Sequence, residues 1–100
     1  MENRFYQMPQ FIIEEKKYNE IRNNSKIAYM LLYNRHRLSE MRDRYQDKNG
    51  VFVYYTREEM QKDLNIGKNT SIKVFKELKK ANLIIEKKEG KHYKIYLIRV

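Results

Sequence analysis

Cysteine is absent from the 100-residue sequence, which excludes disulfide bonds and a thiolate metal site. Glycine occurs three times and proline once, so we expect a folded, helix-rich chain and not a disordered one. The first ten residues lack the apolar run of a signal peptide, and the apolar run at residues 27–33 is too short to span a bilayer. The sequence therefore predicts a cytoplasmic protein of one domain.

Catalysis also finds little support in the sequence. There are two histidines and no glycine-rich loop that would hold a phosphate. Glu58 and Glu59 fall in the first turn of an expected helix, where the helix dipole favours carboxylates in any case. His36 stands between two arginines, and we expect it to face solvent or an interface. The sequence predicts no enzyme, no cofactor and no metal site.

Positive charge is in clear excess. The chain has 22 Lys and Arg against 13 Asp and Glu, a formal net charge of +9. Residues 68–94 contain nine lysines and three glutamates, which gives +6 in about a quarter of the chain. A basic balance of this size favours a polyanionic partner, which is nucleic acid or, with less support, an anionic membrane surface.

The first half of the chain is expected to contain an arm, a helix and a strand. Residues 1–22 are interpreted as an N-terminal arm with a short helical segment, and residues 23–100 as the main domain. Asn23, Asn24 and Ser25 offer helix-capping side chains. The helix expected after them runs to about Arg44 and should bury an apolar stripe at three-, four- and seven-residue spacing. The stripe consists of Ile27, Met30, Leu31, Leu38 and Met41. A turn at 47–50 and a strand at 51–55 follow.

The second half has the pattern of a winged helix-turn-helix. Thr56 and Glu59 form a capping box, which predicts a helix over 57–64. A break at 65–67 precedes a helix over 68–81, and two strand-like runs around Gly90 predict a hairpin over 84–98. The expected fold class is mainly α with a small β-hairpin.

The helix over 68–81 has one apolar and one basic face. Ser71, Val74, Phe75 and Leu78 share one side, and the opposite side carries Asn69, Lys73, Lys76 and Lys80. The first residues of such a helix touch base edges in the DNA major groove, so Lys68 and Asn69 are expected to read bases and Thr70 to contact a phosphate. Lys73 and Lys76 would reach bases or phosphates. The alternative is that the basic face is simply solvated.

The expected wing is basic at its tip. Lys87, Lys88, Lys91 and His92 surround one glutamate, and we expect them to contact the DNA backbone or the minor groove. The alternative is that these lysines only prevent edge-to-edge pairing of the hairpin.

The N-terminal arm has two possible uses. Arg4 would suit a minor groove, whereas Phe5, Tyr6 and Phe11 would suit packing on the domain or on a second subunit. We favour packing or dimerisation, and therefore expect a homodimer.

Four segments carry a resemblance to a known family. "RFYQMPQF", "NNSKIAYMLLYNRHRLS", "YTREEMQKDLNIGKNT" and "FKELKKANLI" resemble the N-terminal domain of the RepA_N plasmid replication initiators of Gram-positive bacteria. The resemblance covers nearly the whole chain. It implies a winged helix related to that of the primosome protein DnaD, dimeric binding to repeated origin sites (iterons), and contacts with host replication proteins through a C-terminal domain outside this chain.

Two residues depart from the family pattern. The family often has Ser where this chain has Gly67, and an apolar residue where it has Ser71, which affects the cap and the packing of the recognition helix. Two other functions stay open on the sequence: a winged-helix transcriptional regulator that binds a promoter, and a winged helix used for protein interaction.

Overall fold

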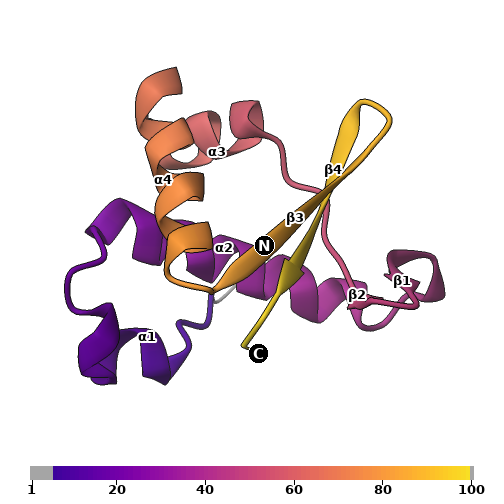
Figure 1. Ribbon diagram of the computed structural model, residues 1–100, viewed down its shortest axis with the longest axis horizontal. Helices are drawn as coiled ribbons and strands as arrows, with labels where there is room; N and C mark the ends of the chain where they lie inside the picture. The colour runs from indigo at the N-terminus through magenta and orange to yellow at the C-terminus, as the bar shows by residue number, and fades with distance from the viewer. Residues whose placement is uncertain (1–5, 100) are drawn as a thin grey trace, which may run out of the picture.

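The computed structural model describes residues 6–99 and has the helices and the hairpin that the sequence predicts (Figure 1). The elements are α1 (Gln10–Glu14), η1 (Lys16–Tyr18), α2 (Asn23–Ser39), η2 (Asp43–Tyr45), β1 (Gln46–Asp47), β2 (Gly50–Val51), α3 (Arg57–Leu64), α4 (Lys68–Lys80), β3 (Ile84–Glu89) and β4 (His92–Leu97). The strands form two antiparallel pairs, β1 with β2 and β3 with β4. The predicted fold class, winged helix-turn-helix, is confirmed.

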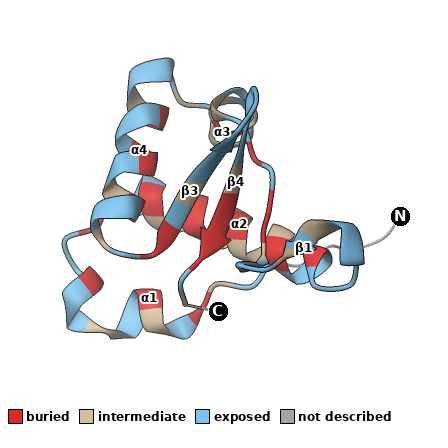
Figure 2. Ribbon diagram, turned by 45° about the vertical axis from the view of Figure 1, so that its right-hand side comes forward, coloured by how far each residue is buried: buried red, intermediate tan, exposed pale blue. Residues whose placement is uncertain are grey.

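One hydrophobic core joins the helices to the base of the hairpin. Figure 2 shows buried residues on the inner side of α4 and at the lower end of β4, while the upper hairpin is exposed. Phe75 of α4 is fully buried, and truncating such a side chain to alanine costs about 3–5 kcal/mol. The core members include Ile12, Tyr18, Ile21, Ala28, Tyr29, Leu32, Met60, Val74, Phe75, Leu78, Leu83, Ile84, Ile95 and Leu97. The segment before residue 23 is therefore part of the same core as the winged helix.

The apolar stripe predicted to be buried in α2 is not the face that the structure buries. The buried face consists of Ser25, Ala28, Tyr29, Leu32, His36 and Ser39. Leu38 is 63% exposed and Met41 is 80% exposed. Both stripes have helical spacing, and the second one buries Tyr29, whose hydroxyl donates to the carbonyl of Arg99. Packing against the rest of the fold selects the face, and it leaves apolar residues of α2 at the surface.

His36 is also placed differently from the expectation. It is buried rather than facing solvent, and its Nδ1 lies 3.1 Å from Oε1 of Glu40. Burial lowers the pKa of His36, against the opposing effect of Glu40. His36 is therefore a core residue of α2.

The region between α2 and α3 contains more structure than predicted. α2 ends at Ser39, not near Arg44, and η2 and β1 follow. The turn at 47–50 is confirmed, with the amide of Asn49 donating to Oδ1 of Asp47 at 2.8 Å. The strand predicted over 51–55 is reduced to the end of β2 and a single bridge, in which Val53 and Ile95 exchange two hydrogen bonds of 2.9 Å. This bridge joins the segment between β2 and α3, residues 52–56, to β4.

The described part of the arm packs on the domain. The amide of Gln7 donates to the side chain of Asn34 at 3.0 Å, and that side chain donates back to the carbonyl of Gln7 at 2.9 Å. Phe11 packs on Tyr29, with ring centroids 5.9 Å apart. Arg4 and Phe5 lie outside the described residues, and Tyr6 is exposed.

Candidate nucleic-acid interface

The turn between α3 and α4 is built by local chemistry. The Thr56 side chain accepts from the Glu59 amide, and the Glu59 carboxylate accepts from the Thr56 amide, so the predicted capping box is present. Asn65 ends α3 in the left-handed conformation, with φ 54°, and the Ile66 amide closes on the Gln61 carbonyl at 3.0 Å. Asparagine tolerates this conformation better than most residues do. The chain therefore leaves α3 and enters α4 through a tight turn.

The two faces of α4 divide as predicted. Ser71, Val74, Phe75 and Leu78 are buried, while the predicted contact residues are at the surface. Lys68, Asn69, Lys73 and Lys76 are exposed, and Thr70 is half-buried. The described part of the chain has no carboxylate within 4.0 Å of the three lysines among these residues. The basic face of α4 is thus available to a partner.

The two departures from the family pattern have simple consequences. Gly67 is the N-cap of α4 and offers no side chain to the first amides of the helix. Ser71 is fully buried, but its hydroxyl donates to the carbonyl of Lys68 at 2.8 Å, so it leaves no unpaired polar group in the core.

The tip of the wing carries the other predicted contact residues. Glu89 pairs with His92 across the turn, and Gly90 adopts the left-handed conformation, φ 61°, that this turn requires. Lys87, Lys88, Lys91 and His92 are all exposed. No described acidic side chain forms an ion pair with the three lysines.

Lys94 is a lysine of the wing that is paired with carboxylates. Its ammonium lies 2.7 Å from Glu89 and 3.1 Å from Asp47. Asp47 also accepts a hydrogen bond from the hydroxyl of Tyr96 at 2.5 Å. Lys94 therefore stabilises the folded structure, whereas the lysines at the tip are unpaired.

A buried carboxylate fixes the wing to the helix-turn-helix. The side chain of Glu86 in β3 is only 4% exposed. It accepts two hydrogen bonds from Arg57, at 2.6 and 2.9 Å, and forms an ion pair with Lys79 of α4 at 3.0 Å. The Arg57 guanidinium also lies 3.8 Å from the centre of the Phe75 ring. Burial acts to raise the pKa of Glu86, but the hydrogen bonds from Arg57 and Lys79 outweigh it and hold this pKa below its usual value. We call Glu86, Arg57 and Lys79 the wing clasp.

The wing clasp is not among the features predicted from the sequence. Strand alternation places Glu86 on the same face of β3 as the buried Ile84, and a carboxylate on an inward face requires a cationic partner. That signal predicts a buried ion pair. The partner is Arg57, which lies 29 positions from Glu86 in the chain, so it can be identified only once the fold is known.

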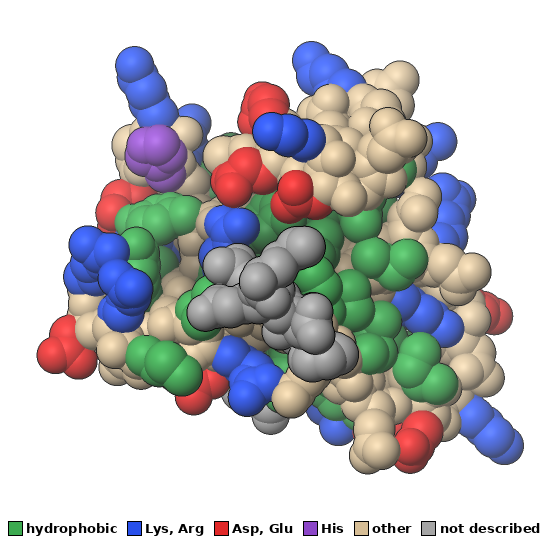
Figure 3. Space-filling view, turned by 180° about the vertical axis from the view of Figure 1, so that it is seen from behind, with side chains coloured by type: hydrophobic (Ala, Val, Ile, Leu, Met, Phe, Trp, Pro, Cys, Tyr) green, Lys and Arg blue, Asp and Glu red, His purple; other side chains and the backbone are tan. Residues whose placement is uncertain are grey.

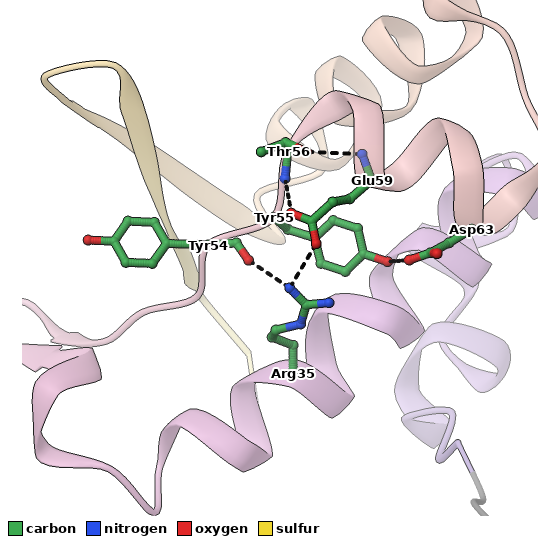
Figure 4. Close-up of polar contacts among 6 residues, drawn as sticks. All are labelled: Arg35, Tyr54, Tyr55, Thr56, Glu59 and Asp63. Carbon is green, nitrogen blue, oxygen red and sulfur yellow. Dashed lines mark hydrogen bonds and ion pairs between the residues drawn. The ribbon is translucent and has the colours of Figure 1, made fainter.

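A second polar cluster fixes α3 on α2 (Figure 4). The guanidinium of Arg35 donates to the carbonyl of Tyr54 at 3.0 Å, lies 3.3 Å from Glu59, and covers the ring of Tyr55 at 4.3 Å. The hydroxyl of Tyr55 donates to Asp63. Burial, with the hydrogen bond to Asp63, raises the pKa of this hydroxyl. The helix-turn-helix is thus joined to α2 by this cluster and to the wing by the wing clasp.

The described residues offer no group of three or more His, Cys, Asp or Glu that could hold a metal ion. None of the helices in this part of the chain combines the length and the apolar composition that a membrane crossing requires.

A family match and a related protein were found for this chain. Residues 4–100 match the family described as the N-terminus of replication initiator protein A (RepA). A 41 kDa protein of Lactobacillus helveticus is 30% identical over 103 residues, which represent 95% of this chain and 29% of that protein. The chain thus spans less than a third of the length of this relative.

Solved structures share the fold. An N-terminal domain of a DNA binding protein is 31% identical, with a TM-score of 0.79, and the match covers 96% of this chain and 75% of that one. A Rep–DNA complex gives 31% identity and a TM-score of 0.77 over the same shares of the two chains. An MDR initiator is 32% identical, with a TM-score of 0.78, over 96% of this chain and 77% of that one.

Proposed function

We propose that this chain, which belongs to the family of replication initiator protein A N-terminal domains, binds duplex DNA sequence-specifically through α4 and the β3–β4 wing. The observation that supports this most directly is the division of α4 into a buried apolar face and an exposed face of unpaired lysines. The wing clasp joins Lys79 of α4 to Glu86 of β3 at 3.0 Å, so the base of the wing is fixed beside α4. The similarity to a solved Rep–DNA complex is in agreement.

Each part of the proposed interface has its own role. Lys68 and Asn69, in the first turn of α4, read base edges in the major groove, since Lys donates to guanine and Asn pairs with adenine. Thr70, Lys73 and Lys76 contact phosphates or bases. Lys87, Lys88, Lys91 and His92, at the tip of the wing, contact the backbone or the minor groove. In this scheme the chain recognises the repeated sites of a plasmid origin and starts replication in the cytoplasm, and it acts by binding and not by catalysis.

Further partners belong to the proposal. We expect two copies to bind together, because repeated or palindromic sites suit two-fold proteins and exposed residues at the end of α2 and just after it offer an apolar surface. Figure 3 shows hydrophobic side chains gathered on the face seen there, and Leu38 and Met41 are exposed. Host replication proteins would be contacted by other parts of a longer protein, since the curated relative is more than three times as long as the match.

Selection of bound duplexes from a randomised pool, followed by fluorescence anisotropy on the enriched site, tests the DNA-binding proposal. Lys68→Ala and Asn69→Ala should each weaken binding by about 1–3 kcal/mol and relax the preference at one position. Lys16→Ala, at an exposed lysine of η1, is the control and should bind like wild type. If both α4 variants bind the enriched site like wild type, α4 is not the recognition helix. Affinity that is weak and the same for all sequences would favour a protein-interaction module.

Sedimentation velocity tests the dimer. The wild-type chain should associate with increasing concentration or on DNA, and Leu38→Ser should reduce this association because it removes an exposed apolar side chain. A wild-type chain that stays monomeric at high micromolar concentration, with and without DNA, would contradict the expectation.

A further inference from the structure

A hollow of about 340 Å³ lies between the start of α2 and the basic face of α4. Arg22 borders it on one side, and Lys73, Lys76 and Lys80 of α4 border it on the other. Glu77 is the only acidic residue that lines the hollow, within the described part of the chain. Four cations against one carboxylate give the lining a net charge of +3. The hollow therefore favours an anion.

The single carboxylate is engaged with the protein itself. Oε1 of Glu77 accepts a hydrogen bond from the amide of Arg22 at 2.9 Å. This bond joins the start of α2 to the C-terminal part of α4, and the two elements lie side by side in Figure 1. Glu77 thus connects the two sides of the hollow.

The N-terminus of α2 is open at this place. α2 is 17 residues long, and its N-cap, Arg22, makes no side-chain capping bond. The amides of Ser25 and Lys26 both donate to the carbonyl of Arg22, at 3.0 and 3.1 Å. The amides of Asn23 and Asn24 have no acceptor within the part of the chain that the structure describes. Free amides and the helix dipole at such an end favour an anion.

Ser25 gives an independent indication of a missing partner. It lines the hollow, is 1% exposed, and its hydroxyl has no hydrogen-bond partner among the described residues. Buried hydroxyls are nearly always paired, because an unpaired one loses its bonds to water without replacement. Its hydrogen turns freely about the Cβ–Oγ bond, so an acceptor that enters the hollow within hydrogen-bond distance of Oγ would pair it.

We propose that the hollow binds a phosphate of the DNA backbone, held by Arg22, the hydroxyl of Ser25 and the first amides of α2. The proposal rests on the DNA-binding function proposed above, because Lys73 and Lys76 belong both to the hollow and to the basic face of α4. A phosphate fixed here positions the backbone beside α4 and so sets the register in which Lys68 and Asn69 meet the bases. The site adds a contact from α2 that neither α4 nor the wing supplies.

Ser25→Ala tests the site with opposite expectations for folding and binding. Removing an unpaired buried hydroxyl should leave the thermal midpoint unchanged or raise it. Losing a hydrogen bond to a charged phosphate should weaken binding to the selected duplex by about tenfold. Ser39→Ala, which removes another buried hydroxyl of α2, is the matched control and should leave DNA affinity unchanged.

Arg22→Gln and duplexes with a single uncharged methylphosphonate provide the second test. Arg22→Gln should make the slope of log K against log salt less steep by about 0.9, because one phosphate contact is lost. One methylphosphonate position should weaken wild type and have little further effect on Arg22→Gln. Asn69→Ala should keep the full effect of that position, since it acts through a base.

The two proposals fail in different ways. If wild type binds the selected duplex and both Ser25→Ala and Arg22→Gln match its affinity and salt slope, the phosphate site is wrong and the function stands. If wild type binds no duplex with sequence preference, the function fails and the phosphate site fails with it.

Discussion

The wing clasp makes a prediction about both stability and its dependence on pH. Glu86→Gln keeps the shape of the side chain and removes its charge, which leaves Arg57 and Lys79 without their shared carboxylate. Removing one partner of a buried ion pair costs about 3–5 kcal/mol. Lys79 is 42% exposed and Arg57 is 28% exposed, so water solvates part of the released charge. We therefore expect a loss of roughly 1.5–3 kcal/mol, in the range of hydrogen bonds to charged groups.

Urea unfolding followed by circular dichroism measures this loss. With a slope of about 1.5 kcal/mol per molar urea, the midpoint should fall by roughly 1–2 M at pH 7. Glu89→Gln is the matched control: its carboxylate is 60% exposed and lies 2.7 Å from Lys94, so it should cost less than about 1 kcal/mol. Equal losses for the two variants would refute the argument that burial makes Glu86 important.

The pH dependence separates the charge of Glu86 from its packing. The pKa of Glu86 is lower in the folded chain than its ordinary value of 4.5. The stability that its ionised form contributes is therefore fully present above pH 4.5 and is lost as the pH falls through the folded pKa. The difference between wild type and Glu86→Gln should shrink over this acidic range. A difference that stays constant would mean that packing, not charge, is lost.

Three other predictions concern the turn, the wing and α2. Gly67→Ser should stabilise the chain by about 0.5–1 kcal/mol, because serine is a better N-cap and makes the unfolded state less flexible. Gly90→Ser should destabilise the chain, because Gly90 has a φ of 61°. Calorimetric midpoints of the two variants that shift in the same direction would contradict this. Lys88→Ala and Lys91→Ala should weaken selected and mixed-sequence duplexes about equally and reduce the salt slope by about 0.9 each; a loss confined to the selected site would assign them to base reading. Burial lowers the pKa of His36, so stability should fall as the pH drops below 6.5, and the urea midpoint of His36→Gln should lack this part of the fall.

The sequence predicts α3 and α4 well because their signals are local. The capping box at Thr56 and Glu59 needs only four consecutive residues, and the apolar spacing of α4 allows a single buried face. The residues of α4 and of the wing tip that were predicted to contact DNA lie at the surface, because the same local patterns also determine which side chains face outward. Whether they touch DNA stays a prediction, which the binding experiments address.

The sequence does not determine which face of α2 is buried. Two stripes share helical spacing, one with Leu38 and Met41, the other with Tyr29 and Leu32. The choice depends on packing against residues far away in the chain, such as Arg99, 70 positions from Tyr29, whose carbonyl accepts a hydrogen bond from the Tyr29 hydroxyl. The same limit explains the missed wing clasp and the missed hollow, since both join segments far apart in the chain.

The bridge between Val53 and Ile95 divides the wing into two regions with different amide exchange. At the bridge, Ile95 of β4 has a neighbouring backbone on both sides, in β3 and at Val53, and from Ile95 to Leu97 the side chains of β4 are buried. Above it, residues 86–94 have only the β3–β4 ladder, and the tip is exposed. Amide protons should therefore exchange slowly at Ile95 and quickly near Gly90. A ligand that orders the tip would be detected as new protection confined to that upper half.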